Sequence, residues 1–268
     1  MNVAIVVPVY HANELHYDFT RQTIESVNLS DNIQGKIFII NNFSLPQFEP
    51  NLDSFQSRYP QMIIKNPKGN QVGASWNLGI KMALEEGFDY VIVCNNDIIF
   101  HKNAIGNLVD FAEKHKEFIL WTMAEWTDLR TIKTVDDNVF DDNFDEHPHF
   151  SCFMVNKKTM DTVGWFDENL HMAYMEDGEF HYRILLSGNK AVKVSKARFY
   201  HYGSRTISVD DDIFAINRRT YEENREYIKK KWNTDFHQKA HHPPEEILKE
   251  KDIYKFPFND KLKGWKDW

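Results

Sequence analysis

Polar side chains follow three apolar segments in the amino-terminal half of the sequence. These polar ends are Pro8-Val9-Tyr10-His11, Asn41-Asn42 and Asn95-Asn96-Asp97. Asn and Asp are common in turns, where their side chains bond the local backbone, so no single cluster predicts a function. Ligands of open parallel sheets, however, bind beyond the carboxyl ends of the strands. The convergence of three polar ends in one sheet therefore predicts a binding site that can surround a nucleotide.

A phosphate-bearing ligand at this edge needs a charge partner other than a glycine-rich loop. The sequence contains neither the dinucleotide-binding fingerprint nor the P-loop spacing. Asp97 is the natural candidate to hold a divalent cation, because hard cations take carboxylate oxygens and complete their shells with phosphates and water. One carboxylate makes a weak site, so we expect a second protein ligand.

The segments that carry these clusters alternate between two hydrophobic patterns. Strands are predicted at residues 3–7, 36–40, 62–64, 90–94 and 118–123, and helices at 15–27, 72–83 and 104–115. Short β-branched runs are typical of strands buried on both faces, and apolar residues three or four positions apart are typical of helices. The alternation predicts an α/β fold with a mostly parallel central sheet and helices on both faces.

The pattern changes after residue 123. Acidic residues crowd an Asn-rich stretch over 136–146, which we interpret as a solvated loop rather than a metal site. The later predicted elements are strands at 150–155, 191–194 and 198–202 and helices at 176–186 and 210–232. Beyond residue 241 the sequence mixes charge, proline and aromatics without a period, which predicts an extended strap over the surface.

The composition restricts the class of protein. Of the 268 residues, 42% are hydrophobic and 27% charged, which excludes disorder and a coiled coil as the main architecture. No apolar run approaches the roughly 20 residues that span a bilayer, and no signal sequence is evident. The two cysteines fit a reducing compartment, so we expect a cytoplasmic protein. The net charge of −8 argues against strong nonspecific binding to nucleic acid.

Six blocks of the sequence, in order, resemble glycosyltransferase family 2, whose members have the GT-A fold. The blocks comprise residues 6–10, 39–44, 74–80 with 89–97, 163–168, 174–183 and 199–204. The third is similar to the segment that leads into the family's Asp-x-Asp motif. The resemblance implies a GT-A catalytic domain over 1–208, with a nucleotide-sugar half (1–123) and an acceptor half (124–208). A helical and extended appendage over 209–268 would follow.

The resemblance also implies catalytic and metal-binding roles. Asp97 matches the last Asp of the Asp-x-Asp motif, which holds Mn²⁺ or Mg²⁺ against the nucleotide diphosphate, and His201 matches the late metal-binding histidine. Asp177 matches the general base of inverting members, with Glu176 beside it. Arg183 either pairs with Asp177 or reaches a phosphate. Purely structural interpretations stay open, because Asp is a favoured helix N-cap and a histidine can serve as an interior hydrogen-bonding group.

The remaining implied residues form the pocket for the nucleotide sugar. They are Pro8, Val9, Tyr10, Asn41, Asn42, Trp76, Asn77, Asn95, Asn96 and Trp165. The two tryptophans are either packing residues or platforms beside the sugar or acceptor. Three places depart from the family pattern: Asn95 and Asn41 stand where an Asp is usual, and Gly69-Asn70-Gln71 stands where an Asn-x-Gly is common. Asn95 can still bond the ribose but adds no charge, and Asn41 leaves the choice of nucleobase open.

The function that the resemblance implies is metal-dependent transfer of a hexosyl or pentosyl group, with inversion, from a nucleotide-diphosphate sugar. A UDP-sugar is favoured. The acceptor hydroxyl belongs to a saccharide or to a hydroxymethylated DNA base, the latter because the carboxyl-terminal tail weakly resembles glycosyltransferases of tailed bacteriophages, which work in the host cytoplasm. Two alternatives stay open: a noncatalytic nucleotide- or carbohydrate-binding module, and a sugar nucleotidyltransferase. The latter would carry a glycine-rich basic loop where this chain has residues 10–14.

Overall fold

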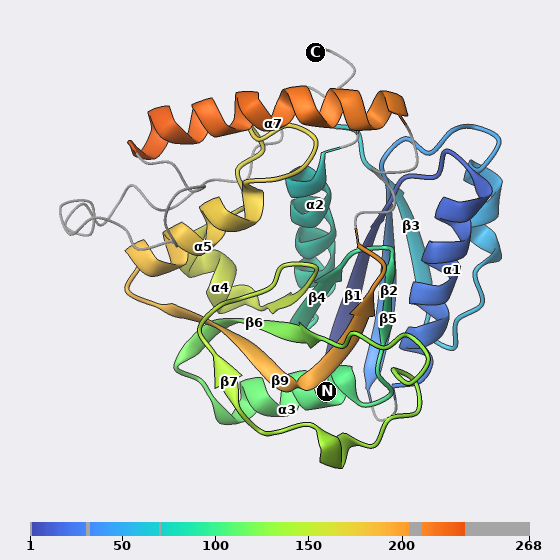
Figure 1. Cartoon of the computed structure of the whole chain (residues 1–268), viewed down its shortest axis with the longest axis vertical. Helices are drawn as coiled ribbons and strands as arrows, with labels where there is room; N and C mark the ends of the chain where they lie inside the picture. Colours follow the sequence, from blue (N-terminus) through green and yellow to red (C-terminus); the bar gives the residue numbers. More distant parts are fainter. Residues whose placement is uncertain (1, 31–32, 70, 204–210, 234–268) are drawn as a thin grey trace.

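A mixed β-sheet with helices on both faces forms the framework of the protein (Figure 1). The computed structural model describes residues 2–30, 33–69, 71–203 and 211–233. The helices are α1 (Glu14–Val27), α2 (Val72–Glu85), α3 (Ala104–Lys114), α4 (Lys157–Val163), α5 (Glu176–Leu186) and α7 (Asp211–Trp232). The strands are β1 (Asn2–Val9), β2 (Gln34–Asn41), β3 (Gln61–Lys65), β4 (Tyr90–Cys94), β5 (Ile98–Phe100), β6 (Phe118–Glu125), β7 (Phe144–Asp145), β8 (Cys152–Val155) and β9 (Lys190–His201). Short 3-10 turns cover Glu49–Ser54 and Asp137–Val139.

The order of the strands places the three polar ends side by side. The sheet runs β3-β2-β1-β4-β8-β6-β9-β5, with β7 on β9. Strands β1 to β4 are mutually parallel, so the carboxyl ends of β1, β2 and β4 meet at one edge. β8 inserts antiparallel between β4 and β6, and β9 lies parallel to β6. The α/β fold class is confirmed, with a sheet that is mixed in its second half.

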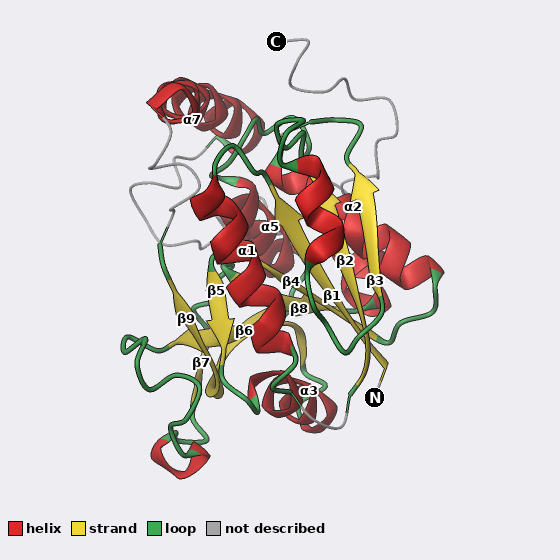
Figure 2. Ribbon diagram, turned by 90° about the vertical axis from the view of Figure 1, so that its right-hand side faces the viewer, coloured by secondary structure: helices red, strands yellow, loops and turns green. Residues whose placement is uncertain are grey.

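Apolar side chains cover both faces of β1, as a central strand requires. Val3 and Ile5 face a core that includes α1 and α3, while Ala4 and Val6 face a core that includes α2, α4 and α5. Figure 2 shows the helices distributed over the two faces of the sheet. Because successive side chains of a strand point to opposite faces, the continuous apolar run of β1 is the sequence signature of this double burial.

Most predicted elements are confirmed, and several short ones were not foreseen. The helix predicted at 176–186 has these bounds, and the one predicted at 210–232 begins one residue later. The strands predicted at 191–194 and 198–202 are a single strand, β9, whose pairing with β6 shifts register between Met123 and Ala124. β5, β7 and α4 were not predicted, because segments of 2 to 7 residues carry too little periodicity. The predicted strap beyond residue 241 lies outside the described residues.

The acidic stretch at 136–146 lies against the lysines of β9. Asp142 pairs with Lys196 at 2.7 Å, Asp145 with Lys193 at 2.8 Å and Glu146 with Lys190 at 2.7 Å. These ion pairs support the loop interpretation. Within the described residues, no three or more His, Cys, Asp and Glu side chains cluster closely enough to hold a metal ion.

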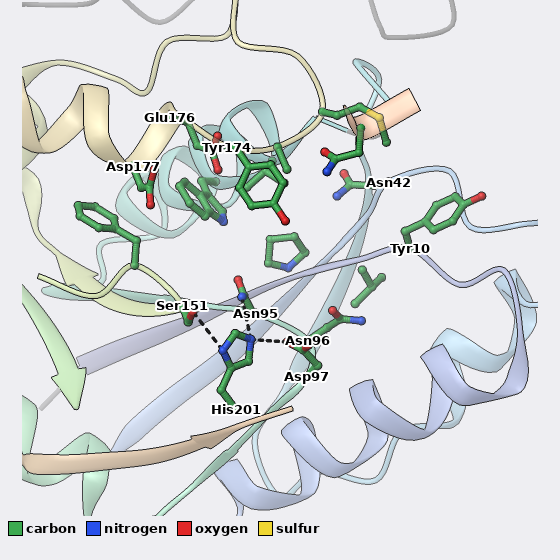
Figure 3. Close-up of a pocket in the computed structure, with 18 residues that line it drawn as sticks. Tyr10, Asn42, Asn95, Asn96, Asp97, Ser151, Tyr174, Glu176, Asp177 and His201 are labelled. Carbon is green, nitrogen blue, oxygen red and sulfur yellow. Dashed lines mark hydrogen bonds and ion pairs between the residues drawn. The ribbon is translucent and has the colours of Figure 1, made fainter. Parts of the chain in front are cut away.

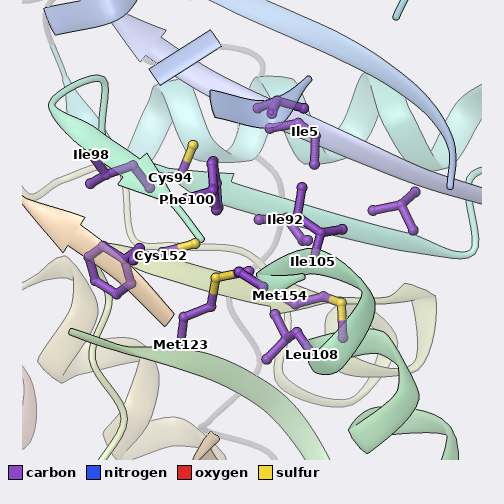
Figure 4. Close-up of a cluster of buried hydrophobic side chains, with 14 of the residues drawn as sticks. Ile5, Ile92, Cys94, Ile98, Phe100, Ile105, Leu108, Met123, Cys152 and Met154 are labelled. Atoms are coloured by element: carbon purple, nitrogen blue, oxygen red, sulfur yellow. The ribbon is translucent and has the colours of Figure 1, made fainter. Parts of the chain in front are cut away.

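The two cysteines lie inside the core between the sheet and α3 (Figure 4). Cys94 and Cys152 are register partners on β4 and β8, and both thiols are free and buried. Burial raises the pKa of each thiol, so both stay protonated. No helix in the described part of the chain is both long and apolar enough to cross a bilayer.

Candidate active site

A cavity of about 250 Å³ lies where the polar ends of β1, β2 and β4 meet (Figure 3). The loop before α5, the end of β9 and α7 complete its wall. The predicted residues that line it are Pro8, Val9, Tyr10, Asn42, Trp76, Asn95, Asn96, Asp97, Glu176, Asp177 and His201. The lining residues that were not predicted are Val72, Phe150, Ser151, Met172, Ala173, Tyr174 and Asn217.

Asp97 and His201 lie in direct contact in this cavity, although 104 residues separate them in the sequence. Antiparallel pairing of β5 with β9 sets Ile98 opposite His201 and so delivers the imidazole beside the end of β4. The Nε2 atom of His201 lies 3.1 Å from Oδ1 of Asp97. Burial lowers the pKa of His201, but the hydrogen bond and the charge of Asp97 outweigh burial, and the pKa is raised.

The donor atoms of this pair fit a divalent cation. Two ligands at right angles around Mg²⁺, each about 2.1 Å from the ion, are about 3.0 Å apart. The separation of 3.1 Å between Asp97 Oδ1 and His201 Nε2 is close to this value. A carboxylate oxygen and an imidazole nitrogen suit Mg²⁺ and Mn²⁺, with the remaining positions left for phosphate and water. Asp97 and His201 are therefore suited to share one ion with a diphosphate.

The other ring nitrogen of His201 has a polar neighbour of its own. Nδ1 lies 3.4 Å from the hydroxyl oxygen of Ser151. An imidazole that binds a metal through Nε2 carries its proton on Nδ1, and a neighbouring oxygen that accepts a hydrogen bond from this N–H group fixes the orientation of the ring. Ser151 lies directly before β8 and was missed in the sequence, because a lone serine carries no signal.

Glu176 and Asp177 begin α5 on the opposite side of the cavity (Figure 3). The N-cap is Met175, so Asp177 lies in the first turn of the helix rather than capping it. Burial first, and the neighbouring charge of Asp177 second, raise the pKa of Glu176 to about 8. Glu176 is therefore protonated at neutral pH. Asp177 accepts a hydrogen bond from its neighbour Gly178 N at 2.7 Å.

Asn42 presents its amide group to the cavity in a fixed orientation. The backbone N–H of Lys68 donates to Oδ1 of Asn66, so Nδ2 of Asn66 must face Asn42. Oδ1 of Asn42 accepts that bond at 3.0 Å and a second one from the Ser75 hydroxyl at 2.7 Å. With its oxygen occupied inside the protein, Asn42 offers its NH₂ group to a ligand, and an NH₂ donor requires a hydrogen-bond acceptor such as a carbonyl oxygen.

Arg183 does not reach the cavity, which corrects its prediction as a catalytic residue. Its side chain is fully buried and pairs with Glu179 at 2.7 Å, not with Asp177. Two further guanidinium nitrogens donate to the carbonyl oxygens of Val163 and Trp165, each at 2.7 Å. Arg183 thus ties α5 to the segment after α4 and cannot bind a phosphate in this arrangement.

Three other predicted residues also lie outside the cavity wall. Asn41 donates to Glu49 at 3.3 Å and accepts a backbone N–H from the loop after β2. Asn77 bonds both the N–H and the carbonyl of Phe166, each at 2.9 Å, and so fastens α2 to the segment before α5. Trp165 packs beside the core that contains α2 and α5. These three residues were predicted because they belong to the same sequence blocks as the residues that face the cavity, and membership of a block does not show which way a side chain points.

The loop before α5 and helix α7 were not predicted to form the site. Tyr174 is 38% exposed at the cavity and stacks edge-on against Tyr221 of α7, with ring centroids 5.8 Å apart. Asn217 of α7 lines the cavity, is 5% exposed, and its Oδ1 has no hydrogen-bond partner within the described residues. Such contacts depend on where α7 packs, which no local pattern encodes.

The fold and this site define a class of enzyme. The sheet, with helices on both faces and a cavity at its strand ends, has a GT-A-like fold. The family model for glycosyl transferase family 2 matches residues 4–164. The chain therefore belongs to glycosyl transferase family 2, and the predicted family is confirmed, while the blocks at 174–183 and 199–204 lie beyond the matched residues. A comparison with curated proteins found no significant match.

Solved structures show the same fold at low sequence identity. TarS 1–349 from S. aureus, in complex with UDP-GlcNAc, is 13% identical with a TM-score of 0.59, covering 89% of this chain and 74% of its own. Mannosyltransferase PcManGT from Pyrobaculum calidifontis, with GDP-Man and Mn²⁺, is 11% identical with a TM-score of 0.62, covering 94% and 69%. GalNAc-T7, with UDP, GalNAc and Mn²⁺, is 14% identical with a TM-score of 0.60, covering 75% and 44%.

Proposed function

We propose that the protein transfers a sugar from a UDP-sugar to an acceptor hydroxyl with inversion at the anomeric carbon, using Mn²⁺ or Mg²⁺. The contact of 3.1 Å between Asp97 and His201, opposite Glu176 and Asp177 across one cavity, carries this proposal. The cavity thus has a place for a charged diphosphate and, facing it, a carboxylate that can receive a proton.

Asp97 and His201 would hold the cation against the donor. A bound Mn²⁺ or Mg²⁺ stabilises the negative charge that develops on a departing diphosphate. Asn95 contributes no charge, but its Nδ2 lies 3.4 Å from His201 Nε2 and can turn to bond a ribose hydroxyl. The solved GT-A relatives with Mn²⁺ in their complexes support a metal-dependent reaction.

Asp177 would act as the general base. The acceptor hydroxyl loses a proton as its oxygen attacks the anomeric carbon, and a positioned carboxylate can accept that proton. Glu176 is protonated at neutral pH, since burial and the charge of Asp177 raise its pKa to about 8. Attack from the side of Asp177, with the diphosphate leaving toward Asp97, inverts the configuration.

Asn42 supports a donor with a carbonyl-bearing base. Its NH₂ group faces the ligand, and uracil offers carbonyl oxygens to such a donor. Guanine shares this property, so UDP and GDP both fit, and the complexes of TarS and GalNAc-T7 with UDP or a UDP-sugar favour UDP. The acceptor is a saccharide or a hydroxymethylated DNA base, and the half-exposed ring of Tyr174 at the cavity can stack on either.

The experiment that tests this function is a binding and transfer screen. Calorimetry with UDP-, GDP- and dTDP-sugars, with and without Mn²⁺, is expected to show tightest binding for UDP-sugars with the metal. Asp97→Ala is expected to abolish the metal dependence of binding. Transfer is then measured on methyl glycosides and on hydroxymethylated oligonucleotides, with NMR assignment of the product anomer. Retention of configuration would exclude the proposed mechanism, and donor binding without turnover on any acceptor would favour a noncatalytic module.

A further inference from the structure

The loop from His171 to Met175, directly before the acidic pair, has an unusual backbone. Met172, Tyr174 and Met175 have φ angles of 53°, 76° and 79°. This left-handed region disfavours residues with a side chain, and non-glycine residues persist there only where surrounding contacts impose the conformation. Three such residues within four positions therefore require an external restraint.

Asn224 of α7 supplies most of that restraint. The two N–H groups of its Nδ2 are shared among the carbonyl oxygens of His171, Ala173 and Tyr174, at 2.9, 3.4 and 3.2 Å. Its Oδ1 accepts the backbone N–H of His171 at 2.8 Å, which fixes the orientation of the amide. The carbonyl of Met172 accepts the backbone N–H of Val72 at 2.8 Å. All four carbonyls from His171 to Tyr174 are thus bonded, three of them to one side chain.

Helix α7 is itself firmly attached beside this loop, so Asn224 acts from a fixed position. Tyr227 donates to Asp167 at 2.8 Å, and Lys231 pairs with Asp167 and Glu179, each at 2.7 Å. Ile228 and Trp232 pack into a cluster with Leu170, Tyr182 and Leu186. Asn224 itself is 1% exposed.

We propose that Asn224 is a positioning residue for catalysis: it holds the loop from His171 to Met175 in its left-handed conformation and thereby places Tyr174, Glu176 and Asp177 at the cavity. Asn224 does not line the cavity, so it acts through the loop and touches no substrate. Within the described residues, the hydrogen bonds of the Asn224 side chain go to the loop and not to the ends of β1, β2 and β4, where the donor is proposed to bind. This inference rests on the proposed function for the role of Asp177, while the restraint on the loop is a property of the fold.

Two substitutions and one matched control test the proposal in the full-length protein. Asn224→Ala removes the amide, and Asn224→Asp keeps its shape and the bond from His171 N–H but loses the three donated bonds. Asn107→Ala is the control. Asn107 of α3 also donates to a carbonyl remote in sequence, that of Lys196 at 3.1 Å, and neither residue lines the cavity. Hydrogen–deuterium exchange is measured on peptides that cover residues 168–180.

Both Asn224 variants are expected to exchange at least tenfold faster in these peptides than wild type, whereas Asn107→Ala is unchanged there. Affinity for UDP with Mn²⁺ is expected to stay within threefold of wild type, while kcat for transfer or donor hydrolysis falls at least tenfold. If both Asn224 variants exchanged at the wild-type rate in residues 168–180, the proposal that Asn224 restrains the loop would be wrong. Faster exchange with an unchanged kcat would overturn the positioning role. Failure of the wild type to bind any nucleotide sugar would instead refute the proposed function and leave the exchange result to decide on the restraint.

Discussion

At the scale of single residues, the two carboxyl groups that begin α5 differ in environment and so in chemistry. Glu176 is 6% exposed, and its raised pKa keeps it neutral at pH 7. Asp177 accepts a backbone N–H and lies at the cavity wall. Two adjacent carboxyl groups in one cavity rarely both carry charge, because each ionised group raises the pKa of the other. Glu176 is thus the neutral member of the pair, which leaves Asp177 as the proposed base.

This division predicts the effect of Asp177→Asn. The variant keeps the shape of the side chain but cannot accept a proton, so kcat for transfer is expected to fall by about 10²- to 10⁴-fold. Affinity for UDP with Mn²⁺, measured by calorimetry, is expected to change less than threefold, since Asp97 and His201 are untouched. A variant that transfers sugar at the wild-type rate would show that another group is the base.

Glu176→Gln is expected to change how stability depends on pH. Because the folded-state pKa of about 8 lies above the ordinary value of 4.5, the folded protein holds a proton that the unfolded chain releases. The contribution of Glu176 to the free energy of unfolding is therefore fully present below pH 4.5 and is lost as the pH rises to about 8. Gln cannot ionise, so the free energy of unfolding of the variant should rise relative to wild type over this window, by at most about 5 kcal/mol. Urea unfolding of both proteins at pH 5 and pH 9 measures the gain, and parallel pH profiles would contradict it.

Sequence alone identified those cavity residues that belong to short local motifs. The polar strand ends and the block around Asp177 could be read directly, because their types and order are specific. Arg183 and Asn77 could not be separated from them, since burial inside an ion pair or a backbone contact depends on packing that sequence adjacency does not reveal. Ser151 and Asn217 carry no pattern at all and enter the site only through the tertiary arrangement.

At the scale of elements, the distance between α2 and the sheet sets the depth of the cavity floor. Gly79 faces β1 so closely that an added Cβ would lie 2.2 Å from Cγ1 of Val6. Val72 and Trp76 of the same helix line the cavity. A helix pushed outward at Gly79 would therefore carry these side chains with it, so the glycine links the packing of the core to the shape of the site.

Gly79→Ala is expected to destabilise the protein by about 1–3 kcal/mol, because the core must shift to admit the methyl group. Gly106→Ala is the matched control: it lies in helix α3, where an added Cβ meets nothing within 4 Å, and is expected to stabilise by about 0.5–1 kcal/mol. Urea unfolding measures both. The double variant Gly79→Ala with Val6→Ala should lose less stability than the sum of the two single losses, because Val6→Ala makes room for the methyl group. A double variant that loses more than this sum would contradict the clash.

Periodicity identified the long elements for physical reasons that also explain the failures. A helix of 14 residues such as α2 repeats its apolar spacing several times, whereas β7 has two residues and no repeat. The single strand β9 was divided in two because Ser195, Lys196 and Ala197 interrupt its apolar pattern. The register shift opposite these residues accommodates the interruption without ending the strand.

At the scale of the whole molecule, α7 lies across the loop before α5 and above α2 (Figure 1). The sequence predicted this helix and its basic end but placed it in an appendage, because a helix pattern does not say what the helix packs against. In the structure, Asn217 reaches the cavity, Asn224 holds the loop, and Lys231 joins α7 to two buried carboxylates. The family model ends at residue 164, so these contacts are built from the part of the chain that follows it.

Lys231 provides the charge that fastens α7 to the rest of the protein. Asp167 and Glu179 are fully buried, and although burial opposes ionisation of Glu179, the charges of Arg183 and Lys231 hold its pKa below the ordinary value. Lys231→Met keeps the apolar stem but leaves both carboxylates short of a cation, so unfolding free energy is expected to fall by roughly 3 kcal/mol. Lys229→Met, which removes a surface pair with Glu226, is expected to change it by less than about 0.5 kcal/mol. Equal stability of the two variants would show that the apolar contacts of Ile228 and Trp232 are sufficient to hold α7 in place.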